Sequence, residues 1–305
     1  MSKLHEENRK LSLPTLCSLF GYSRQAYYQS SKSHFLQESK EDIVLQVVAD
    51  IRTHMPSLGG RKLHYLLQSR LPIELQIGRD ALFSLLRRTG YLQRRRIYHP
   101  STTDSHHRMH TYKNLIKEFI PVRSNQLYVA DITYIRVENN TFYYLSLITD
   151  AYSHRIMGWC LLDNLDTTGP IIALQMALKE LPTGSQLIHH SDRGTQYCCG
   201  KYIKLLKGLQ ISMTEDGDPR ENAIAERVNG ILKHEWLNSM EIKTLSQGRD
   251  LLRKVIHLYN NVRPHSSIGM LTPSQAHTQE GKLKRLWKNY YKRKEVIKEK
   301  IQTNV

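Results

Sequence analysis

The sequence predicts an α/β core, built on a mixed five-stranded sheet and preceded by all-helical modules. Residues 41–99 carry apolar residues at helical spacing, with a break at Gly59-Gly60 and a stop at Thr89-Gly90. From residue 121 the period changes, and strand-like runs rich in β-branched and aromatic residues appear. These runs occupy residues 127–137, 141–153, 155–163, 186–192 and 210–214. Three consecutive strands followed by alternating helices and strands are typical of a mixed sheet with helices on both faces.

Five segments are expected along the chain. Residues 1–36 contain two short helices around a turn at Gly21, with Ser23 as the N-cap of the second helix, which outlines a helix-turn-helix. Residues 41–99 form a second helical module of the same DNA-binding type. A linker at 100–120 leads to the core at 121–280, and a basic tail follows at 281–305.

The net charge of +16 is unevenly distributed along the 305 residues. Residues 51–100 contain ten basic and two acidic residues, residues 251–305 contain twelve and three, and residues 101–250 contain 16 and 17. Two cationic blocks around a near-neutral centre favour nucleic acid as the partner, with an anionic membrane as the weaker alternative. No apolar run is long enough to span a bilayer, and the N-terminus lacks a signal-peptide core, so a cytoplasmic protein with reduced thiols is expected.

Arginines mark the last helix of the 41–99 module as its DNA-binding element. Leu82, Leu85 and Leu86 lie on one side of this helix, and the arginines lie elsewhere. The predicted DNA contacts are Arg79, Arg87, Arg88, Arg94, Arg95 and Arg96. A solvated charged face is the alternative for any one of them. The basic tail is interpreted as a non-specific phosphate-binding segment, with a solvated tail as the alternative.

Two aspartates occupy positions where an apolar strand would exclude a charge. Asp131 lies in the middle of the run VADITYI, and Asp192 directly follows the run LIHHS. Burying an unpaired carboxylate is costly, so each of them is interpreted as a metal ligand; a structural bond to the backbone or to an arginine is the alternative for Asp131. His190 and Ser191 are candidates for shaping the metal site or contacting DNA, and a buried structural histidine is the alternative.

A third carboxylate is expected on the helix that follows the fifth strand. Glu221 is explained by helix capping, because Asp218 fits the N-cap and Glu221 the third helical position. Glu226 has no such explanation, and the opposite face of its helix is apolar and can pack on the sheet. Its polar stripe consists of Asn222, Asn229 and Lys233. Asn222 and Lys233 are candidate DNA contacts, and a solvent-exposed Glu226 is the alternative to a ligand.

Three carboxylates from two strands and one helix make an oxygen-rich site. Hard divalent cations suit such ligands, so Mg²⁺ or Mn²⁺ is expected at Asp131, Asp192 and Glu226. Two such ions about 4 Å apart activate an attacking water or hydroxyl and stabilise the leaving oxygen of a phosphodiester. The basic flanks would then hold the DNA backbone while the acidic centre holds two ions.

With these residues identified, the sequence resembles the transposases of the IS-three group of insertion sequences, in their second-reading-frame form with a retroviral-integrase-type core. The resemblance rests on the order and spacing of five blocks: ADITYI, YLSLITDAYSHRIMGW, HHSDRGTQY, SMTEDGDPRENAIAERVNGILKHEW and YNNVRPHSSIGMLTPSQA. It covers residues 120–280, and residues 41–110 are similar to the group's helix-turn-helix module. The sequence departs from the pattern at Ala130, which is usually Thr, and in a slightly shorter connection between Asp192 and Glu226.

The resemblance implies a ribonuclease-H-like fold and a catalytic DDE triad at Asp131, Asp192 and Glu226. It also implies cleavage at transposon ends and attack of the freed 3′-hydroxyl on another phosphodiester of double-stranded DNA. A homo-multimer on DNA, in the bacterial cytoplasm and associated with the nucleoid, is expected. Fusion or partnership with the product of an upstream reading frame is expected as well.

Two other functions stay open at this point. A DNA-binding regulator with an inert core would use the basic modules, although it would not need three carboxylates. A nuclease of the same fold would hydrolyse DNA without joining it, and the sequence does not separate these two reactions. The stretch YNNVRPH, residues 259–265, is interpreted as structural, folding back on the core.

Overall fold

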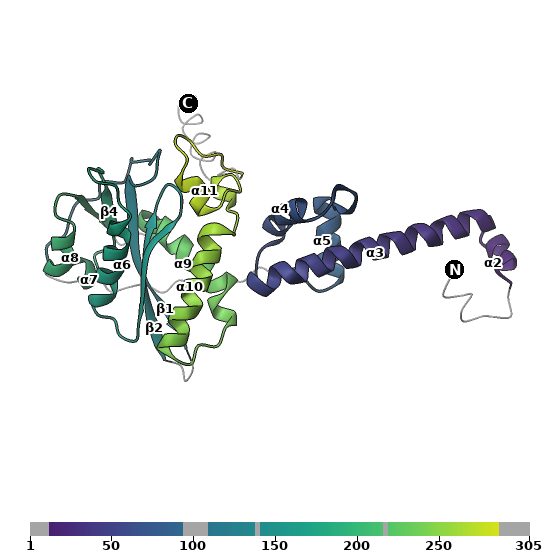
Figure 1. Cartoon of the computed structure of the whole chain (residues 1–305), viewed down its shortest axis with the longest axis horizontal. Helices are drawn as coiled ribbons and strands as arrows, with labels where there is room; N and C mark the ends of the chain where they lie inside the picture. Colours follow the sequence, from purple (N-terminus) through teal and green to yellow (C-terminus); the bar gives the residue numbers. More distant parts are fainter. Residues whose placement is uncertain (1–11, 94–108, 138–140, 216–218, 287–305) are drawn as a thin grey trace, which may run out of the picture. The chain divides into compact units, whose positions relative to one another are not determined.

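The computed structural model describes residues 12–93, 109–137, 141–215 and 219–286 (Figure 1). The chain forms two compact units, Met1–Thr53 with Leu63–Leu92 and His54–Lys62 with Gln93–Val305. The predicted DNA contacts Arg94, Arg95 and Arg96 lie outside the described residues, and so do part of the linker (100–108) and most of the basic tail (287–305). Every described helix is too short or too polar to cross a bilayer.

The first unit is all-helical, as expected. Its elements are α2 (Leu13–Leu19), α3 (Arg24–His54), α4 (Gly60–Arg70), η1 (Ile73–Leu75) and α5 (Arg79–Arg88). Ser12 caps α2 by accepting the amide of Thr15, and Gly21 makes the predicted turn with a φ of 70°, which a glycine adopts without strain. Ser23 Oγ accepts the amide of Ala26 at the start of α3, which is the capping bond expected from the sequence.

The second helix of the first unit is much longer than the sequence indicated. We expected a short helix near residue 30 and a boundary between residues 36 and 41, whereas α3 runs without interruption from Arg24 to His54. Residues 24–54 contain no glycine and no proline before Pro56, so nothing in them stops a helix. Side-chain pairs four residues apart, His34 with Glu38 and Gln37 with Glu41, support the helix across the expected boundary.

The C-terminal half of α3 forms the core of the first unit with α4 and α5. Its buried residues are Val44, Val48 and Ile51, and α5 buries Leu82, Leu85 and Leu86 as predicted. Polar bonds tie the same elements together. Lys40 Nζ donates to the carbonyl of Glu74 at 2.9 Å, and Arg70 Nη1 lies 2.9 Å from Asp50 Oδ2.

The second unit contains the predicted mixed five-stranded sheet. The strands are β1 (Leu127–Arg136), β2 (Phe142–Asp150), β3 (Ile156–Leu162), β4 (Ile188–Ser191) and β5 (Gln210–Met213). Their order in the sheet is β3-β2-β1-β4-β5. The first three strands pair antiparallel as a meander. Strand β4 pairs parallel with β1, and β5 pairs parallel with β4. The helices between the later strands provide the crossovers that parallel pairing needs.

Helices cover both faces of this sheet (Figure 1). The elements on one face are α6 (Thr168–Lys179), α7 (Thr195–Cys198) and α8 (Gly200–Leu205). Those associated with the other face are α9 (Ala223–Glu235) and α10 (Leu245–Asn261), and short elements follow or intervene: η3 (Pro219–Asn222), η4 (Leu237–Ser239), η5 (Ser266–Ile268) and α11 (Pro273–His277). Gly158 allows the close approach of α6, because a Cβ there would lie 1.9 Å from the carbonyl oxygen of Ala173.

The alternation of side chains along β1 decides which face carries the polar residues. Tyr128 and Ala130 pack into the core beneath α6, α7 and α8. Leu127 and Val129 pack with Ala225 of α9 on the opposite face. Because side chains alternate along a strand, Asp131 follows Leu127 and Val129 onto the α9 face.

Helix α10 protects the edge strand β3. Asn260 Oδ1 accepts the amide of Ile156, and Asn260 Nδ2 donates to the Ile156 carbonyl, both at 3.0 Å. Arg249 Nε donates to the carbonyl of Leu161 at 3.1 Å. These bonds satisfy backbone groups that an open sheet edge would present to another chain. The structural interpretation of residues 259–265 is confirmed, since Tyr259, Asn260, Arg263 and His265 are all buried.

Candidate active site

Asp131 and Asp192 come together through the register of two parallel strands. The pairing of β1 with β4 sets Leu127 beside Ile188 and Val129 beside His190. Continued by two residues, the same register brings Asp131 level with Asp192, which follows the last residue of β4. Neighbouring strands lie about 4.8 Å apart, so the two carboxylates start from adjacent backbone positions on one face of the sheet.

Local bonds hold Asp192 at the tip of β4. The amide of Gly194 donates to Asp192 Oδ1 at 2.9 Å, and Ser191 Oγ donates to the Asp192 carbonyl at 2.9 Å. A Cβ at position 194 would lie 3.0 Å from Asp192 Oδ1, so a larger residue would press on the carboxylate. The half-buried Asp192 therefore keeps a defined position before α7 begins.

Both oxygens of the Asp131 carboxylate are held by protein donors. Asn229 Nδ2, from α9, donates to Asp131 Oδ2 at 2.6 Å, and the amide of Ile132 donates to Asp131 Oδ1 at 2.9 Å. Glu226 lies in the first turn of the same helix and is exposed. The third carboxylate is thus placed on a helix that is bonded directly to the first.

Asn229 is the functional residue that the sequence analysis did not single out. It lies three residues after Glu226 on the same polar stripe, and it is buried. A buried amide on the sheet-facing side of a helix must find hydrogen-bond partners. Its place on the polar stripe, three residues from a proposed ligand, was the signal in the sequence, whereas its direction toward the sheet is seen only in the structure.

The electrostatic environment of Asp131 opposes its negative charge. Burial raises the pKa of this carboxyl to about 7, and the neighbouring charge of Asp192, with a smaller contribution from Glu226, acts in the same direction. The bonds from Asn229 and Ile132 favour the charged form but are outweighed. A site with these properties gains stability when a cation enters it.

The two predicted DNA contacts on α9 differ in their surroundings. Asn222 is buried, and its Nδ2 donates to the carbonyl of Ala130 at 2.9 Å, a docking role that the sequence did not indicate. Lys233 is half-buried and faces the site: burial lowers its pKa, and the charge of Asp131 acts in the opposite direction. A contact between either residue and DNA stays a prediction.

His190 and Ser191 belong to the inner part of the site. His190 is buried, and its Nδ1 lies 2.9 Å from Ser212 Oγ on β5. Burial lowers the pKa of His190 to about 4, so the ring is neutral near pH 7. Ser191 is buried and bonds to the backbone of Asp192.

Glu221 has a structural role, and the structure shows partners that the sequence did not indicate. Its Oε2 accepts the amide of Glu215 at 2.7 Å, and its Oε1 accepts Asn114 Nδ2 at 3.1 Å. Asp218, the expected capping partner, lies outside the described residues. Glu221 therefore bonds the start of the η3–α9 segment to neighbouring loops. Its role is structural and differs from the role expected for Glu226.

The donor atoms of the site suit a hard cation, because Mg²⁺ and Mn²⁺ prefer carboxylate oxygens. The raised pKa of Asp131 points the same way, since two further carboxylates act on it. Within the described ranges, however, no three Asp, Glu, His or Cys side chains are gathered closely enough to hold an ion. The residues fit the metal by chemistry, whereas their side chains do not enclose one in this conformation.

The arginines of α5 lie on its exposed side. Arg79 Nε donates to Asp80 Oδ1 at 2.8 Å, and Arg88 pairs with Glu41 of α3. Arg87 is exposed in the last turn of the helix. Two of these three arginines therefore share their charge with a carboxylate, and their contact with DNA stays a prediction.

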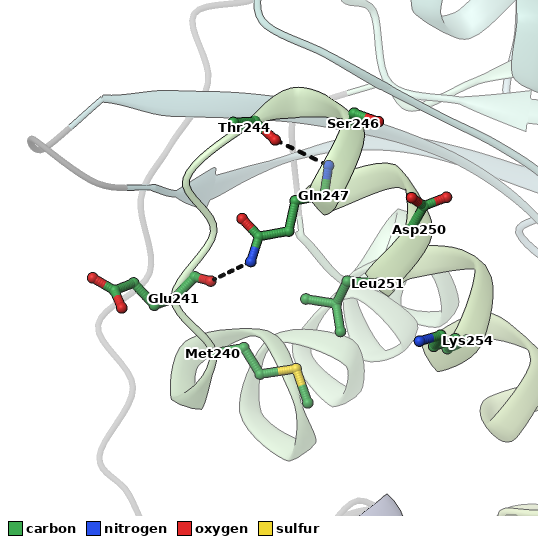
Figure 2. Close-up of a pocket in the computed structure, with 8 residues that line it drawn as sticks. All are labelled: Met240, Glu241, Thr244, Ser246, Gln247, Asp250, Leu251 and Lys254. Carbon is green, nitrogen blue, oxygen red and sulfur yellow. Dashed lines mark hydrogen bonds between the residues drawn. The ribbon is translucent and has the colours of Figure 1, made fainter.

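A pocket of about 670 Å³ lies elsewhere in the second unit, between η4 and the first turns of α10 (Figure 2). Its lining residues are Met240, Glu241, Thr244, Ser246, Gln247, Asp250, Leu251 and Lys254. Gln247 closes the loop beneath it by donating to the carbonyl of Glu241 at 3.4 Å and by accepting the amide of Lys243 at 3.0 Å. None of the three predicted ligands lines this pocket.

The chain is similar to known proteins over most of its length. Two family profiles, both described as integrase core domain, match residues 121–219 and 207–273. The chain is 33% identical over 268 residues to the insertion element IS600 uncharacterized 31 kDa protein of Shigella sonnei, a match that covers 85% of this chain and 96% of that protein. It is 31% identical over 177 residues to the transposase InsF for insertion sequence IS3A of Escherichia coli, covering 55% of this chain and 60% of the relative.

Solved structures resemble part of this chain at low sequence identity. The catalytic core domain of HTLV-2 integrase, determined in complex with magnesium, has 18% sequence identity to this chain and a TM-score of 0.41. The match covers 51% of this chain and 97% of that domain. With the integrase-core profiles and the sheet order, the ribonuclease-H-like fold predicted from the sequence is confirmed.

Proposed function

Since the chain belongs to the IS3 family of insertion-sequence transposases and carries their integrase core, we propose that it cleaves DNA at transposon ends and joins the freed ends to a target. The catalytic residues in this proposal are Asp131, Asp192 and Glu226. The observations that support it are that Asp192 directly follows β4, the strand paired with that of Asp131, and that Asn229 on the helix of Glu226 bonds to Asp131.

Asp131, Asp192 and Glu226 would hold one or two Mg²⁺ or Mn²⁺ ions. The bound metal would polarise the scissile phosphodiester and lower the pKa of the attacking water or hydroxyl. Glu226, which is exposed in the first turn of α9, would complete the ligand set with the two aspartates. Asn229 orients the Asp131 carboxylate, and the bond from Gly194 orients that of Asp192.

The substrate is double-stranded DNA in this proposal. Lys233 is half-buried beside Asp131 and is placed to contact a phosphate next to the scissile bond. Arg79 and Arg87, which are exposed on α5 of the first unit, would contact the DNA backbone. A homo-multimer on DNA and fusion to an upstream-frame product belong to the same proposal.

The test is a strand-transfer assay with the purified full chain, labelled duplexes that carry the ends flanking the gene, and an excess of Mg²⁺. We expect cleaved and joined products, and a loss of roughly 10³-fold or more in both with Asp131→Asn, Asp192→Asn or Glu226→Gln. Glu241→Gln, which removes an exposed carboxylate from the same unit, is the control and should retain activity.

The products distinguish the competing functions. Cleavage without joined strands, under conditions in which both ends are present, would favour a nuclease of the same fold. Sequence-specific binding without Mg²⁺-dependent cleavage would favour a DNA-binding regulator. Full activity in any of the three carboxylate variants would contradict the assignment of that residue.

A further inference from the structure

Charge is unbalanced around Glu235, in the second unit. This carboxylate lies 2.6 Å from Arg263 Nη2 and 3.0 Å from Lys62 Nζ, and both cations belong to the same unit as Glu235. The side chain of Arg263 is 1% exposed and that of Lys62 is 18% exposed. One carboxylate therefore faces two largely buried cations, and burying a charge that has no counterion of its own is costly.

Arg227 adds a third cation to this cluster. It lies on α9, about two turns before Glu235. Burial lowers the pKa of Lys62 to about 8, and the charges of Arg263 and Arg227 act in the same direction, so that the opposing effect of Glu235 is outweighed. The guanidinium of Arg227 is exposed and forms no ion pair within the described part of the chain. The positive charge of the cluster is thus larger than Glu235 alone can offset.

Two buried polar atoms beside these cations have no hydrogen-bond partner among the described residues. They are the hydroxyl of Tyr259, a residue that is 0% exposed, and Nε2 of His265, which is 3% exposed. The two rings meet edge to face with centroids 4.8 Å apart, and the guanidinium carbon of Arg263 lies 5.9 Å from the Tyr259 centroid. Buried polar atoms nearly always have a partner, so two unpaired ones beside an excess of cations indicate a ligand.

We propose that this cluster binds a phosphate group through Lys62, Arg227, Tyr259, Arg263 and His265. Its ammonium, its two guanidinium groups and its phenol hydroxyl are all hydrogen-bond donors. Burial, followed by the charge of Arg263, holds the pKa of His265 well below its usual range, so the neutral ring has one further N–H to donate. A phosphate group offers acceptor oxygens and the negative charge that the cluster lacks, and the planar fork of arginine suits it.

Donors remain on the cations after Glu235 has been satisfied. Among the described residues, Lys62 Nζ donates to Glu235 alone, although an ammonium carries three donors. Arg263 uses Nε and Nη2 for Glu235, and its Nη1 makes only a long bond of 3.4 Å to the carbonyl of Pro264. Lys62 and Arg227 are the more exposed members of the cluster, so a ligand from solvent would meet them first.

The first experiment follows thermal unfolding of the purified full chain in EDTA as inorganic phosphate replaces chloride at constant ionic strength. We expect the melting temperature to rise and saturate, since phosphate would bind the folded state. Arg227→Ala should raise the half-saturating phosphate concentration about tenfold, the effect of losing one hydrogen bond between charged groups. Arg253→Ala, which removes an exposed arginine of α10, is the matched control and should keep the wild-type value. The general stabilisation that phosphate gives any protein is common to all variants.

Tyr259→Phe is the sharper variant, because it removes only the unpaired hydroxyl. In chloride its melting temperature should equal or exceed that of the wild type, since no hydrogen bond is lost. In phosphate its half-saturating concentration should be roughly fivefold higher or more. Tyr197→Phe removes another buried hydroxyl that has no partner among the described residues, and it should leave phosphate binding unchanged. A role of Tyr259 in packing alone would change the melting temperature in chloride and leave the phosphate dependence as it is.

A second experiment distinguishes the two sources of such a group, the DNA backbone and the free phosphate ion. It measures binding of the full chain to a labelled duplex in EDTA by fluorescence anisotropy at several salt concentrations. If the DNA backbone supplies the group, Arg227→Ala should reduce the slope of log K against log salt by about 1, and inorganic phosphate should compete with the duplex. If the free ion is the ligand, the variant should keep the wild-type slope while phosphate still stabilises the protein.

Two results would overturn the proposal. One is a melting temperature that shows no saturable response to phosphate, and the other is a half-saturating concentration that Arg227→Ala and Tyr259→Phe leave unchanged. Only the DNA source rests on the proposed function, and neither experiment involves cleavage or a metal. The strand-transfer assay can therefore fail while the phosphate site persists, and the reverse also holds.

Discussion

Two half-buried acids, Glu235 on α9 and Asp131 on β1, have opposite surroundings, and the difference separates structure from function. Glu235 accepts Arg263 Nη2 at 2.6 Å and Nε at 2.7 Å, and it accepts Lys62 Nζ at 3.0 Å. Burial alone would raise the pKa of Glu235, but its bonds and charge pairs with the two cations outweigh burial and lower it. Burial raises the pKa of Asp131 to about 7, and the neighbouring charges of Asp192 and Glu226 act in the same direction, so the bonds from its two amide donors are outweighed.

The comparison gives a rule for this molecule. A carboxylate whose buried partners are cations of the same chain is neutralised by the fold and contributes to its stability. A carboxylate whose charged neighbours are other carboxylates is a cost to the fold, which a function that uses the charge explains. Four variants test whether Glu235 and Asp131 really differ in this way.

The largest expected effect is on the structural acid. Arg263→Ala leaves Glu235 buried with Lys62 as its remaining cation, and losing one partner of a buried pair costs about 3 to 5 kcal/mol. Urea unfolding, followed by the fluorescence of the buried Trp236, measures the change. Arg253→Ala, which removes an exposed pair with Asp250, should cost about 0.5 kcal/mol or less. A loss below about 1 kcal/mol for Arg263→Ala would show that the ion cluster is not a structural element.

Asp131→Asn should instead stabilise the protein at neutral and higher pH. The folded-state pKa of about 7 lies above the ordinary value of 3.8, so the wild type binds the proton more tightly when folded and loses stability as pH rises through this window. The asparagine of the variant carries no titrating proton, so its stability does not fall in this way. We expect its free energy of unfolding to exceed that of the wild type by up to about 3 kcal/mol at pH 8, and the difference to vanish near pH 4.

Thermal unfolding between pH 4 and pH 8 tests whether Asp131→Asn is stabilising at the higher pH. The exposed Asp163→Asn serves as the control and should show no pH-dependent gain. Added Mg²⁺ should reduce the stability difference between Asp131→Asn and the wild type at pH 8, because a ligand of the folded state raises the stability of the wild type alone. A destabilised Asp131→Asn protein at pH 8 would place Asp131 in the same class as Glu235.

Asn229→Ala should weaken the apparent affinity for Mg²⁺ by about 10- to 100-fold, as expected for a residue that orients a metal ligand. The measurement is the Mg²⁺ concentration at half-maximal cleavage, supported by the Mg²⁺ dependence of the melting temperature. Asn260→Ala removes another buried asparagine from the same unit, where it bonds only to the backbone of Ile156. It should lower stability and leave the Mg²⁺ midpoint unchanged, whereas equal shifts in both variants would indicate a merely structural role for Asn229.

The smallest expected effect is on the stability of the protein at acidic pH. His154 lies near the cationic side of the Glu235 cluster, and burial, followed by the charges of Arg285, Arg263 and Arg227, lowers its pKa to about 4. A depressed histidine pKa adds stability above its ordinary value of 6.5 that is lost as pH falls toward 4. His154→Asn should therefore reduce the acid sensitivity of unfolding by about 1.4 kcal/mol at pH 5.5. Asparagine also tolerates the φ of 63° at this position, and an unchanged pH profile would contradict the assignment.

Much of the fold could be read from local patterns. The strands at 127–137, 141–153 and 155–163 were visible because β-branched and aromatic residues cluster between turns, and the structure places β1, β2 and β3 within those ranges. Ser23 was visible as a helix start, and it accepts the amide of Ala26 at the start of α3. The length of α3 was missed, because the absence of a stop signal between residues 24 and 54 is easier to overlook than a glycine.

By itself, the sequence determined which residues are acidic, where strands and helices form, and which family the chain belongs to, since composition, periodicity and motif order are local properties. Only the tertiary structure decided what lies beside each charge. The pairing of β1 with β4 brings the strand of Asp131 beside the strand that Asp192 follows, the docking of α9 brings Asn229 to Asp131, and the return of the chain after α10 brings Arg263 to Glu235. Residues that are distant in sequence make these contacts, and a pKa depends on distance in space and on burial, which no local pattern contains.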